Sequence, residues 1–220
     1  MNTSTIVGMD FGAPLDLITP TVDGAVLQTL ATTTESLTVT ELRTQIGRYS
    51  PEGIRRVLVR LDQQGIVTTR VAGRTALYTF NRNHLAAPAI TELTELRAVF
   101  IDRLERELAE WAIQTPYAAL FGSVARRAAH RASDVDVFVV RPNDANDAPW
   151  SEQLRSLRAR IHEWTGNQAE ILEYSENEVT AGMRNHDPVL AEIQSSGIPI
   201  SGPPNYLEGQ QPVARSHHTR

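Results

Sequence analysis

The residues best suited to chemistry lie in one short stretch, from Gly122 to Asp136. Gly122-Ser123 follows an apolar run, and Asp134 and Asp136 open a second apolar run. Glycine lets a phosphate approach the backbone, and the N–H groups that begin a following helix point towards that anion. Alternate residues of a strand share a face, so both aspartates face the same way, as Mg²⁺ bound to a substrate's phosphates requires. The stretch predicts a site for a nucleoside triphosphate (NTP) and its metal.

The elements that must position this stretch form an alternating pattern from residue 115 to residue 202. Strands are predicted at 117–122, 134–141, 168–174 and 198–200, and helices at 123–130, 151–164, 176–184 and 188–196. Apolar runs of strand length alternating with amphipathic runs of helix length indicate a layered domain of strands and helices. We therefore predict an α/β domain with a mixed sheet over residues 115–202.

The site motif also resembles that of a known family. Gly-Ser-Val-Ala-Arg-Arg (122–127) and Ser-Asp-Val-Asp (133–136) are similar to the motif of the nucleotidyltransferase superfamily that includes DNA polymerase beta, and within it of the minimal, MNT-type domains. The resemblance covers Tyr117 to Gly202. It implies that the phosphates are held by Gly122, Ser123, Arg126 and Arg127, and that Asp134 and Asp136 bind Mg²⁺ or Mn²⁺. Arg127 stands where glycine is usual in the family, which either crowds the phosphate loop or adds a cation.

The same resemblance implies a third carboxylate on a neighbouring strand, which completes a two-metal site and helps to activate the attacking hydroxyl. The strand 168–174 carries two glutamates, Glu170 and Glu173, on opposite faces. The flanking apolar residues favour Glu170, and Glu173 is the alternative. Asp134, Asp136 and Glu170 are therefore the expected catalytic and metal-binding residues.

A second set of signals lies nearer the amino terminus, in residues 21–82. Helices are predicted at 22–32, at 39–46 behind the capping-box pair Thr38 and Glu41, and at 51–64 behind the cap Ser50. Two β-rich runs, 66–71 and 75–80, follow and are joined by a Gly73-Arg74 turn. Three short helices followed by a hairpin resemble the winged helix-turn-helix domains of bacterial regulators.

In winged helix domains the third helix enters the major groove of DNA and the wing touches the backbone. The segment 22–82 holds eight arginines and five acidic residues, a local charge of +3. The resemblance implies DNA contacts from four arginines: Arg55, Arg56, Arg60 and Arg74. The alternative is a protein-interaction module in which these arginines are a solvated surface.

The remaining segments complete a predicted α+β organisation. Residues 1–20 are expected to form an arm, and residues 83–114 one long connecting helix that also offers a homodimer surface. Residues 203–220 are expected to be a disordered or loosely docked tail, because they are rich in polar residues and proline.

Composition excludes several classes of protein. The 220 residues include no cysteine, so disulfides and thiolate metal sites are excluded. No apolar run approaches the roughly 20 residues of a membrane helix, and the start lacks the pattern of a signal peptide. A net charge of −5 argues against wholesale coating of nucleic acid. We therefore expect a cytoplasmic protein with no membrane partner.

Two functions fit these signals. The first is Mg²⁺-dependent transfer of a nucleotidyl group from an NTP to a hydroxyl of a protein or nucleic-acid acceptor. The winged helix favours an autoregulating antitoxin with a toxin partner, because a drug-modifying enzyme gains nothing obvious from DNA binding. The alternative is a DNA-binding transcriptional regulator whose nucleotidyltransferase domain only binds a nucleotide or a partner.

Overall fold

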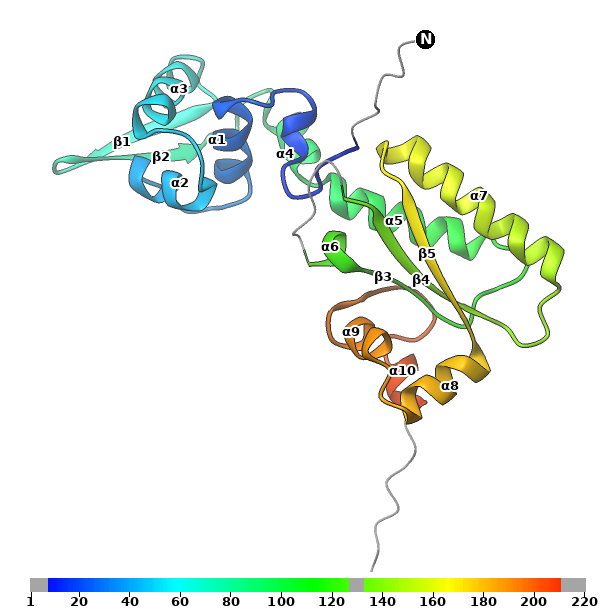
Figure 1. The fold of residues 1–220 in the computed structure, drawn as a ribbon. Coiled ribbons are helices and arrows are strands. Elements are labelled where there is room, and N and C mark those ends of the chain that lie inside the picture. Colours follow the sequence, from blue (N-terminus) through cyan, green and yellow to red (C-terminus); the bar gives the residue numbers. More distant parts are fainter. Residues whose placement is uncertain (1–7, 127–132, 211–220) are drawn as a thin grey trace, which may run out of the picture. The chain divides into compact units, whose positions relative to one another are not determined.

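The structure is a computed structural model that describes residues 8–126 and 133–210. The chain divides into two compact units, each described separately below (Figure 1). One unit is Asp10–Val99, and the other joins Met1–Met9 to Phe100–Arg220. Within the described ranges, no helix is both long enough and apolar enough to cross a membrane.

The unit Asp10–Val99 is built from helices and one hairpin. Its elements are η1 (Pro14–Leu17), α1 (Val22–Ala31), α2 (Val39–Ile46), α3 (Pro51–Gln63), β1 (Val67–Ala72), β2 (Thr75–Phe80) and α4 (Ala87–Thr94). The core residues Leu42, Ile54 and Leu58 are fully buried, and they come from α2 and α3. Burial of such side chains stabilises the unit by about 1.5–3 kcal/mol each.

Local hydrogen bonds fix where these helices begin, as the sequence predicts. The capping box of α2 is confirmed: Thr38 accepts from the N–H of Glu41, and the Glu41 carboxylate accepts from the N–H of Thr38 at 2.7 Å. Ser50 caps α3 by accepting from the N–H of Gly53 at 3.1 Å. Each such cap contributes about 1 kcal/mol.

The strands β1 and β2 form the predicted antiparallel hairpin, in a continuous register from Val67–Phe80 to Ala72–Thr75. Leu37 adds an isolated antiparallel bridge to Tyr78. Between η1 and α4, the order along the chain is therefore α1, the bridging residue Leu37, α2, α3 and the hairpin.

The prediction of a single connecting helix over residues 83–114 is wrong, because two helices occupy this segment. The helix is interrupted at Glu95, and α5 (Leu96–Ala109) follows α4 as a separate helix. The Thr94 hydroxyl donates to the carbonyl of Thr91 at 2.7 Å, so a side chain bonds to the backbone in the last turn of α4.

The second unit is a layered α+β domain, and the predicted mixed sheet is confirmed. Its elements after α5 are β3 (Ala118–Phe121), α6 (Gly122–Ala125), β4 (Val135–Arg141), α7 (Asp147–Thr165), β5 (Ala169–Ser175), α8 (Glu176–Arg184), α9 (Pro188–Ser196), β6 (Ile198–Ser201) and α10 (Tyr206–Gly209). The strand order is β5-β4-β3-β6. Only the β4–β5 pair is parallel, and β3 pairs antiparallel with both β4 and β6.

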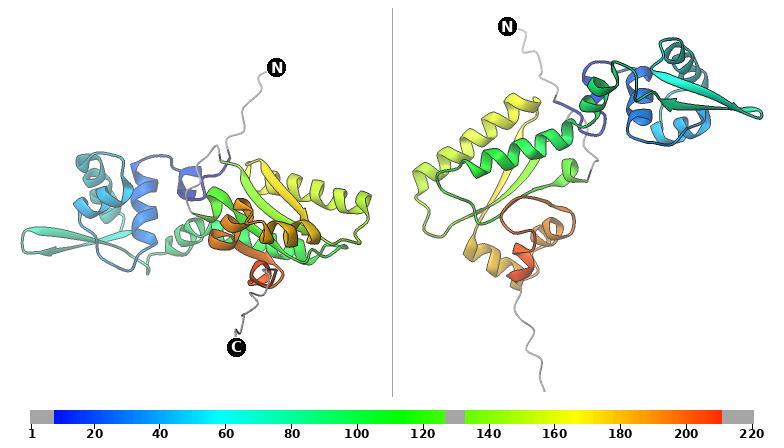
Figure 2. Two further views of the ribbon diagram at one scale, coloured as in Figure 1. Left: turned by 60° about the horizontal axis from the view of Figure 1, so that its bottom comes forward. Right: turned by 180° about the vertical axis from the view of Figure 1, so that it is seen from behind.

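Helices cover both faces of this sheet (Figures 1 and 2). Phe138 and Val140 of β4 pack with residues of α8, α9 and α10 on one face. Helices α5 and α7 lie side by side on the other, where Glu107 pairs with Arg160 at 2.7 Å. Because side chains alternate along β4, Asp136 shares the α8–α9 face with Phe138.

The carboxy-terminal segment differs from the predicted disordered tail over residues 203–210. Helix α10 forms there, Leu207 is buried, and the ring of Tyr206 stacks on Tyr117 with centroids 5.2 Å apart. Leu207 and Tyr206 thus dock this segment on the domain, together with a hydrogen bond from Thr180 to Gln210, although its composition is polar. Residues 211–220 lie outside the described residues.

The predicted amino-terminal arm also divides. Gly8 and Met9 belong to the unit that contains the sheet, whereas the chain from Asp10 onwards belongs to the other unit. Phe11 and Leu15 are buried in this segment, whereas the apolar side chains of Leu17 and Ile18 are exposed.

Candidate active site

Strands β4 and β5 bring two of the predicted carboxylates, Asp136 and Glu170, to one end of the sheet. Asp136 is the register partner of Phe121 in β3 and of Glu170 in β5. Partner residues on adjacent strands project from the same face, with backbones about 4.8 Å apart. Asp136 and Glu170 are therefore neighbours, directly beside the turn in which β3 becomes α6. Asp134 is exposed and immediately precedes β4.

Two features of the structure favour glycine at position 122, where α6 starts. Its φ of +65° is in the left-handed region, which residues with a Cβ atom rarely occupy. A Cβ atom added there would also overlap Oδ2 of Asp136. Glycine thus lets the backbone lie against the carboxylate, and the N–H of the next residue, Ser123, donates to Asp136.

The electrostatics of Asp136 reflect this crowding. Burial raises the pKa of Asp136 above its ordinary value, and the negative charges of Asp134 and Glu170 raise it further. The N–H of Ser123 and the guanidinium of Arg126 oppose that rise in pKa without cancelling it. Excess negative charge at a half-buried carboxylate is the environment that a divalent cation would relieve.

The oxygen donors are of the right kind for Mg²⁺ or Mn²⁺, but they are not gathered into a complete shell. Among residues 8–126 and 133–210, no three His, Asp or Glu side chains lie close enough to hold a metal ion. The three-carboxylate group predicted from Asp134, Asp136 and Glu170 is thus not assembled in this structure. Mg²⁺ usually binds one or two carboxylates together with substrate phosphates, so Asp134 and Asp136 still fit it.

The two glutamates of β5 occupy different environments. Glu173 is the partner of Val139, so it lies on the face opposite to Asp136. Its carboxylate accepts from the indole Nε1 of Trp150 at 2.9 Å and lies 4.0 Å from Arg141. Glu173 is therefore engaged in packing α7 against β5, and Glu170 is the glutamate on the Asp136 face.

Of the two arginines in the motif, only Arg126 lies within the described residues. Arg126 ends α6 and forms an ion pair with Glu192 of α9. Arg127, the departure from the family motif, lies outside the described residues. The helix predicted over 123–130 is described only from Gly122 to Ala125.

The arginines predicted to contact DNA lie in the other unit and are partly neutralised within it. On α3, Arg55 pairs with Glu52 at 2.9 Å, and Arg56 lies 3.8 Å from the same carboxylate. Arg60 pairs with Asp23 of α1, so it ties two helices together. Arg74 is exposed in the turn between β1 and β2.

Sequence reasoning missed two residues near the site. Glu192 pairs with Arg126, but nothing in the spacing of α9 marks it. Asn167 is 3% exposed and takes part in five hydrogen bonds through its side chain and backbone, although its place beside Gly166 suggests only a surface turn. Burial of a polar residue in a turn has no local sequence signal.

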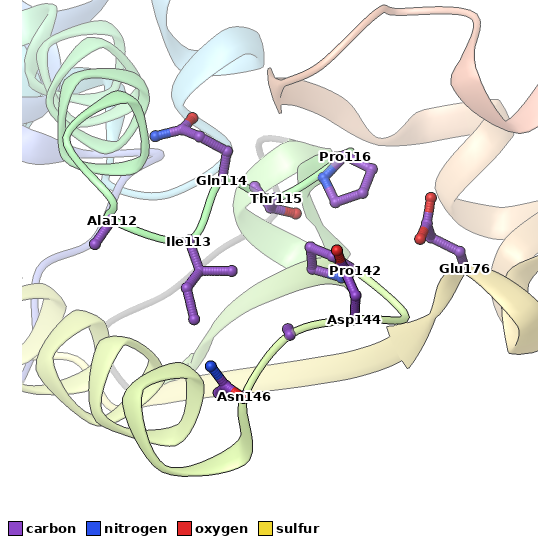
Figure 3. A pocket seen from close by; sticks show the side chains of 10 residues that line it. Ala112, Ile113, Gln114, Thr115, Pro116, Pro142, Asp144, Asn146 and Glu176 are labelled. Carbon is purple, nitrogen blue, oxygen red and sulfur yellow. The ribbon is translucent and has the colours of Figure 1, made fainter.

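A hollow of about 580 Å³ lies at the other end of β4. It is lined by the loop after α5 and the loop after β4, with Glu176 at its edge (Figure 3). Asp134 precedes β4 and Asp136 is its second residue, whereas Pro142 in this hollow follows its last residue. The hollow is thus separate from the carboxylates, and the chemistry of the side chains, not the volume, locates the candidate active site.

Comparison with known proteins finds a family match within the second unit. Residues 101–181 match the family model of the nucleotidyltransferase domain. No protein with a curated description matches the sequence. A crystal structure of a mutant MntA–HpeT toxin–antitoxin shares 14% identity, with a TM-score of 0.35, over 50% of this chain and 79% of that one.

A toxin–antitoxin crystal structure with AMP-PNP shares 16% identity, with a TM-score of 0.37, over the same fractions of the two chains. The family match spans α5 to α8, so it includes the Gly122-Ser123 turn, both aspartates and both glutamates. The second unit of this chain therefore carries a nucleotidyltransferase domain.

Proposed function

We propose that this chain transfers a nucleotidyl group from an NTP to a hydroxyl group of a protein or nucleic-acid acceptor, with Mg²⁺ as cofactor. The observation that supports this most is the register of Asp136 with Glu170 beside Gly122. It sets two carboxylates beside the glycine turn that begins α6, where the family motif is expected to hold phosphates.

In the proposed reaction, the acceptor oxygen attacks the α-phosphorus and the bond from that phosphorus to the bridging oxygen breaks. Pyrophosphate leaves with the electron pair, and the acceptor's proton passes to the carboxylate of Glu170. Gly122 and Ser123 hold the β- and γ-phosphates, with Arg126 balancing their charge. Asp134 and Asp136 hold Mg²⁺, which when bound neutralises charge that develops on the phosphoryl oxygens. The catalysis is mostly positioning and charge neutralisation.

The test is transfer of label from α-labelled NTPs, one at a time, to macromolecules of a cell lysate with Mg²⁺. We expect a labelled product with the wild-type chain, and none with the Asp134→Ala/Asp136→Ala double variant or with EDTA. Thermal melting must show that the double variant folds. Equal labelling by both proteins, or none by the wild type with any NTP, contradicts the proposal.

For biological role, we propose an autoregulating antitoxin that modifies a toxin partner. This rests on the nucleotidyltransferase domain together with the winged-helix resemblance of residues 21–82. A toxin encoded next to this chain should carry the label on a hydroxyl side chain, which mass spectrometry of the co-expressed pair would locate. An unmodified toxin after co-expression would remove this role while leaving the transferase activity open.

The second candidate is a DNA-binding regulator whose nucleotidyltransferase domain only binds a nucleotide or a partner. The exposed arginines of α3 and of the hairpin turn favour it. Gel shifts with the DNA upstream of its own gene would show binding that weakens as salt rises. Absence of binding at low salt contradicts this candidate.

A homodimer that uses the α4–α5 segment is also proposed, and light scattering would give its mass.

A further inference from the structure

One buried amide joins the start of the chain to the start of the strand that bears the aspartates. The Asn167 side chain accepts from the N–H of Met9 at 2.9 Å, and its Nδ2 donates to the carbonyl of Met9 at 3.2 Å. The same Nδ2 donates to the carbonyl of Ser133 at 2.9 Å. Both protons of the amide are therefore used, one on each segment.

The contacts of Asn167 lie next to the carboxylates of the candidate active site. Ser133 immediately precedes Asp134, and Asn167 lies three residues before Glu170. The N–H of Val135 donates to the carbonyl of Gln168 at 2.8 Å, which closes the same junction from the backbone. Asn167 thus fixes where β4 begins relative to β5, and with it the spacing of Asp134 from Glu170.

Backbone groups around Asn167 support the same junction. The backbone N–H of Asn167 donates to Oγ1 of Thr165 at 3.0 Å, and the carbonyl of Thr165 accepts from the N–H of Met9 at 3.0 Å. A Cβ atom added to Gly8 would overlap the Asn167 side chain. Gly8 and Met9 therefore pack directly on the amide, although the chain continues into the other unit from Asp10.

We infer that Asn167 is a positioning residue that holds Asp134 for metal and triphosphate binding, and that Gly8 and Met9 are the clamp that holds Asn167. This inference rests on the proposed nucleotidyl transfer. The start of the chain becomes part of the catalytic unit, so a change at Gly8 acts on Asp134 through one amide. Asn167 touches no reacting atom.

Two variants in the full-length chain test this inference from opposite sides. Asn167→Ala removes the side-chain hydrogen bonds without adding a charge. Gly8→Ala leaves the amide chemically intact but displaces it. Gly209→Ala is the matched control, because no atom lies within 4 Å of the position of its added Cβ. Thermal melting establishes that each variant is folded at the assay temperature.

The first readout is kinetic, with Mg²⁺ varied at saturating NTP. We expect both Asn167→Ala and Gly8→Ala to lower kcat by about tenfold or more, and to raise the Mg²⁺ concentration needed for half-maximal rate, with rescue at high Mg²⁺. Gly209→Ala should match the wild type. A role in stability alone would lower the melting temperature and leave kcat and the Mg²⁺ dependence unchanged, and that result would overturn the inference.

The second readout does not depend on activity. Hydrogen–deuterium exchange of the peptide that spans Ser133–Asp136 should be faster in Asn167→Ala and Gly8→Ala than in the wild type and in Gly209→Ala. If the wild type transfers no nucleotide, the proposed function fails, and exchange still decides the inference. Faster exchange then supports the clamp on the Asp134 segment, and unchanged exchange in both variants overturns it.

Discussion

Asp136 and Glu170 are register partners on the parallel strands β4 and β5, whereas Glu173, three residues along β5, faces the other side of the sheet. The distinction rests on strand geometry alone, because side chains alternate and register pairs share a face. Glu170 therefore adds to the negative charge around Asp136, whereas Glu173 accepts a hydrogen bond from Trp150 of α7.

The first prediction separates these two glutamates. Glu170→Gln should lower kcat by about 10²–10⁴-fold, the range for loss of a general base, because an amide cannot take the acceptor's proton. Glu173→Gln should transfer label at nearly the wild-type rate, since glutamine still accepts from the Trp150 indole. Initial rates with α-labelled NTP measure both. Equal losses in the two variants would exclude Glu170 as the base.

The second prediction concerns Gly122. Gly122→Ala places a Cβ atom at a φ of +65° and against the Asp136 carboxylate. We expect a loss of about 1–2 kcal/mol in unfolding free energy from the backbone alone, and near-complete loss of transfer. Denaturant unfolding and the labelling assay measure the two effects.

Gly47→Ala is the control for Gly122→Ala. Gly47 has a φ of +69° and no atom within 4 Å of an added Cβ atom, so the substitution carries the same backbone cost without the contact. It should lose a similar amount of stability and keep transfer activity. If Gly47→Ala also abolishes transfer, the contact of Gly122 with Asp136 is not the cause.

The third prediction concerns pH. Burial and the nearby carboxylates raise the pKa of Asp136 in the folded state above the ordinary value of 3.8. The folded state therefore binds the proton more tightly than the unfolded state does. Stability from this group is present below the unfolded pKa and is lost as pH rises through the folded pKa.

Asp136→Asn should accordingly raise the melting temperature at pH 7, where the wild type carries the disfavoured charge. The advantage should shrink as pH falls towards 3.8, where the wild-type carboxyl becomes protonated in both states. The same variant should be inactive in transfer. Scanning calorimetry from pH 3.5 to pH 7 tests this, and an Asp136→Asn chain less stable than the wild type at pH 7 would contradict it.

The fourth prediction concerns Glu192, which pairs with Arg126. Glu192→Gln should release Arg126 and lower the Kd for a non-hydrolysable ATP analogue with Mg²⁺ by a few-fold, about 1 kcal/mol or less for an exposed pair. Exposed Glu208→Gln is the control for the change in net charge. Calorimetric titration gives both Kd values, and weaker binding by Glu192→Gln would mean that Glu192 supports the site.

The fifth prediction separates surface arginines from structural ones. Arg56→Ala and Arg74→Ala should weaken any DNA binding and each reduce the salt slope by about 1, if each contacts one phosphate. Arg60→Ala should instead lower thermal stability, because Arg60 pairs with Asp23 across α1 and α3. Gel shifts at several salt concentrations and melting curves measure the two effects. DNA affinity unchanged in both Arg56→Ala and Arg74→Ala would favour the protein-interaction alternative.

The sequence by itself determined most of the elements and the residues that could do chemistry. Caps at Thr38 and Ser50 mark helix starts because they bond to residues three positions away, and strand alternation depends only on near neighbours. The Gly122-Ser123 turn and the Asp134–Asp136 pair were recognisable for the same reason, since motif and spacing are local properties.

Only the tertiary structure decided how distant segments meet. Strand register sets Glu170 beside Asp136, the docking of Tyr206 on Tyr117 orders residues 206–209, and Asn167 joins Met9 to Ser133. Each contact spans tens of residues along the chain, and its energy depends on burial that the whole fold creates. A polar turn residue such as Asn167 looks the same in sequence whether it faces water or is buried between two segments, because only packing removes the water.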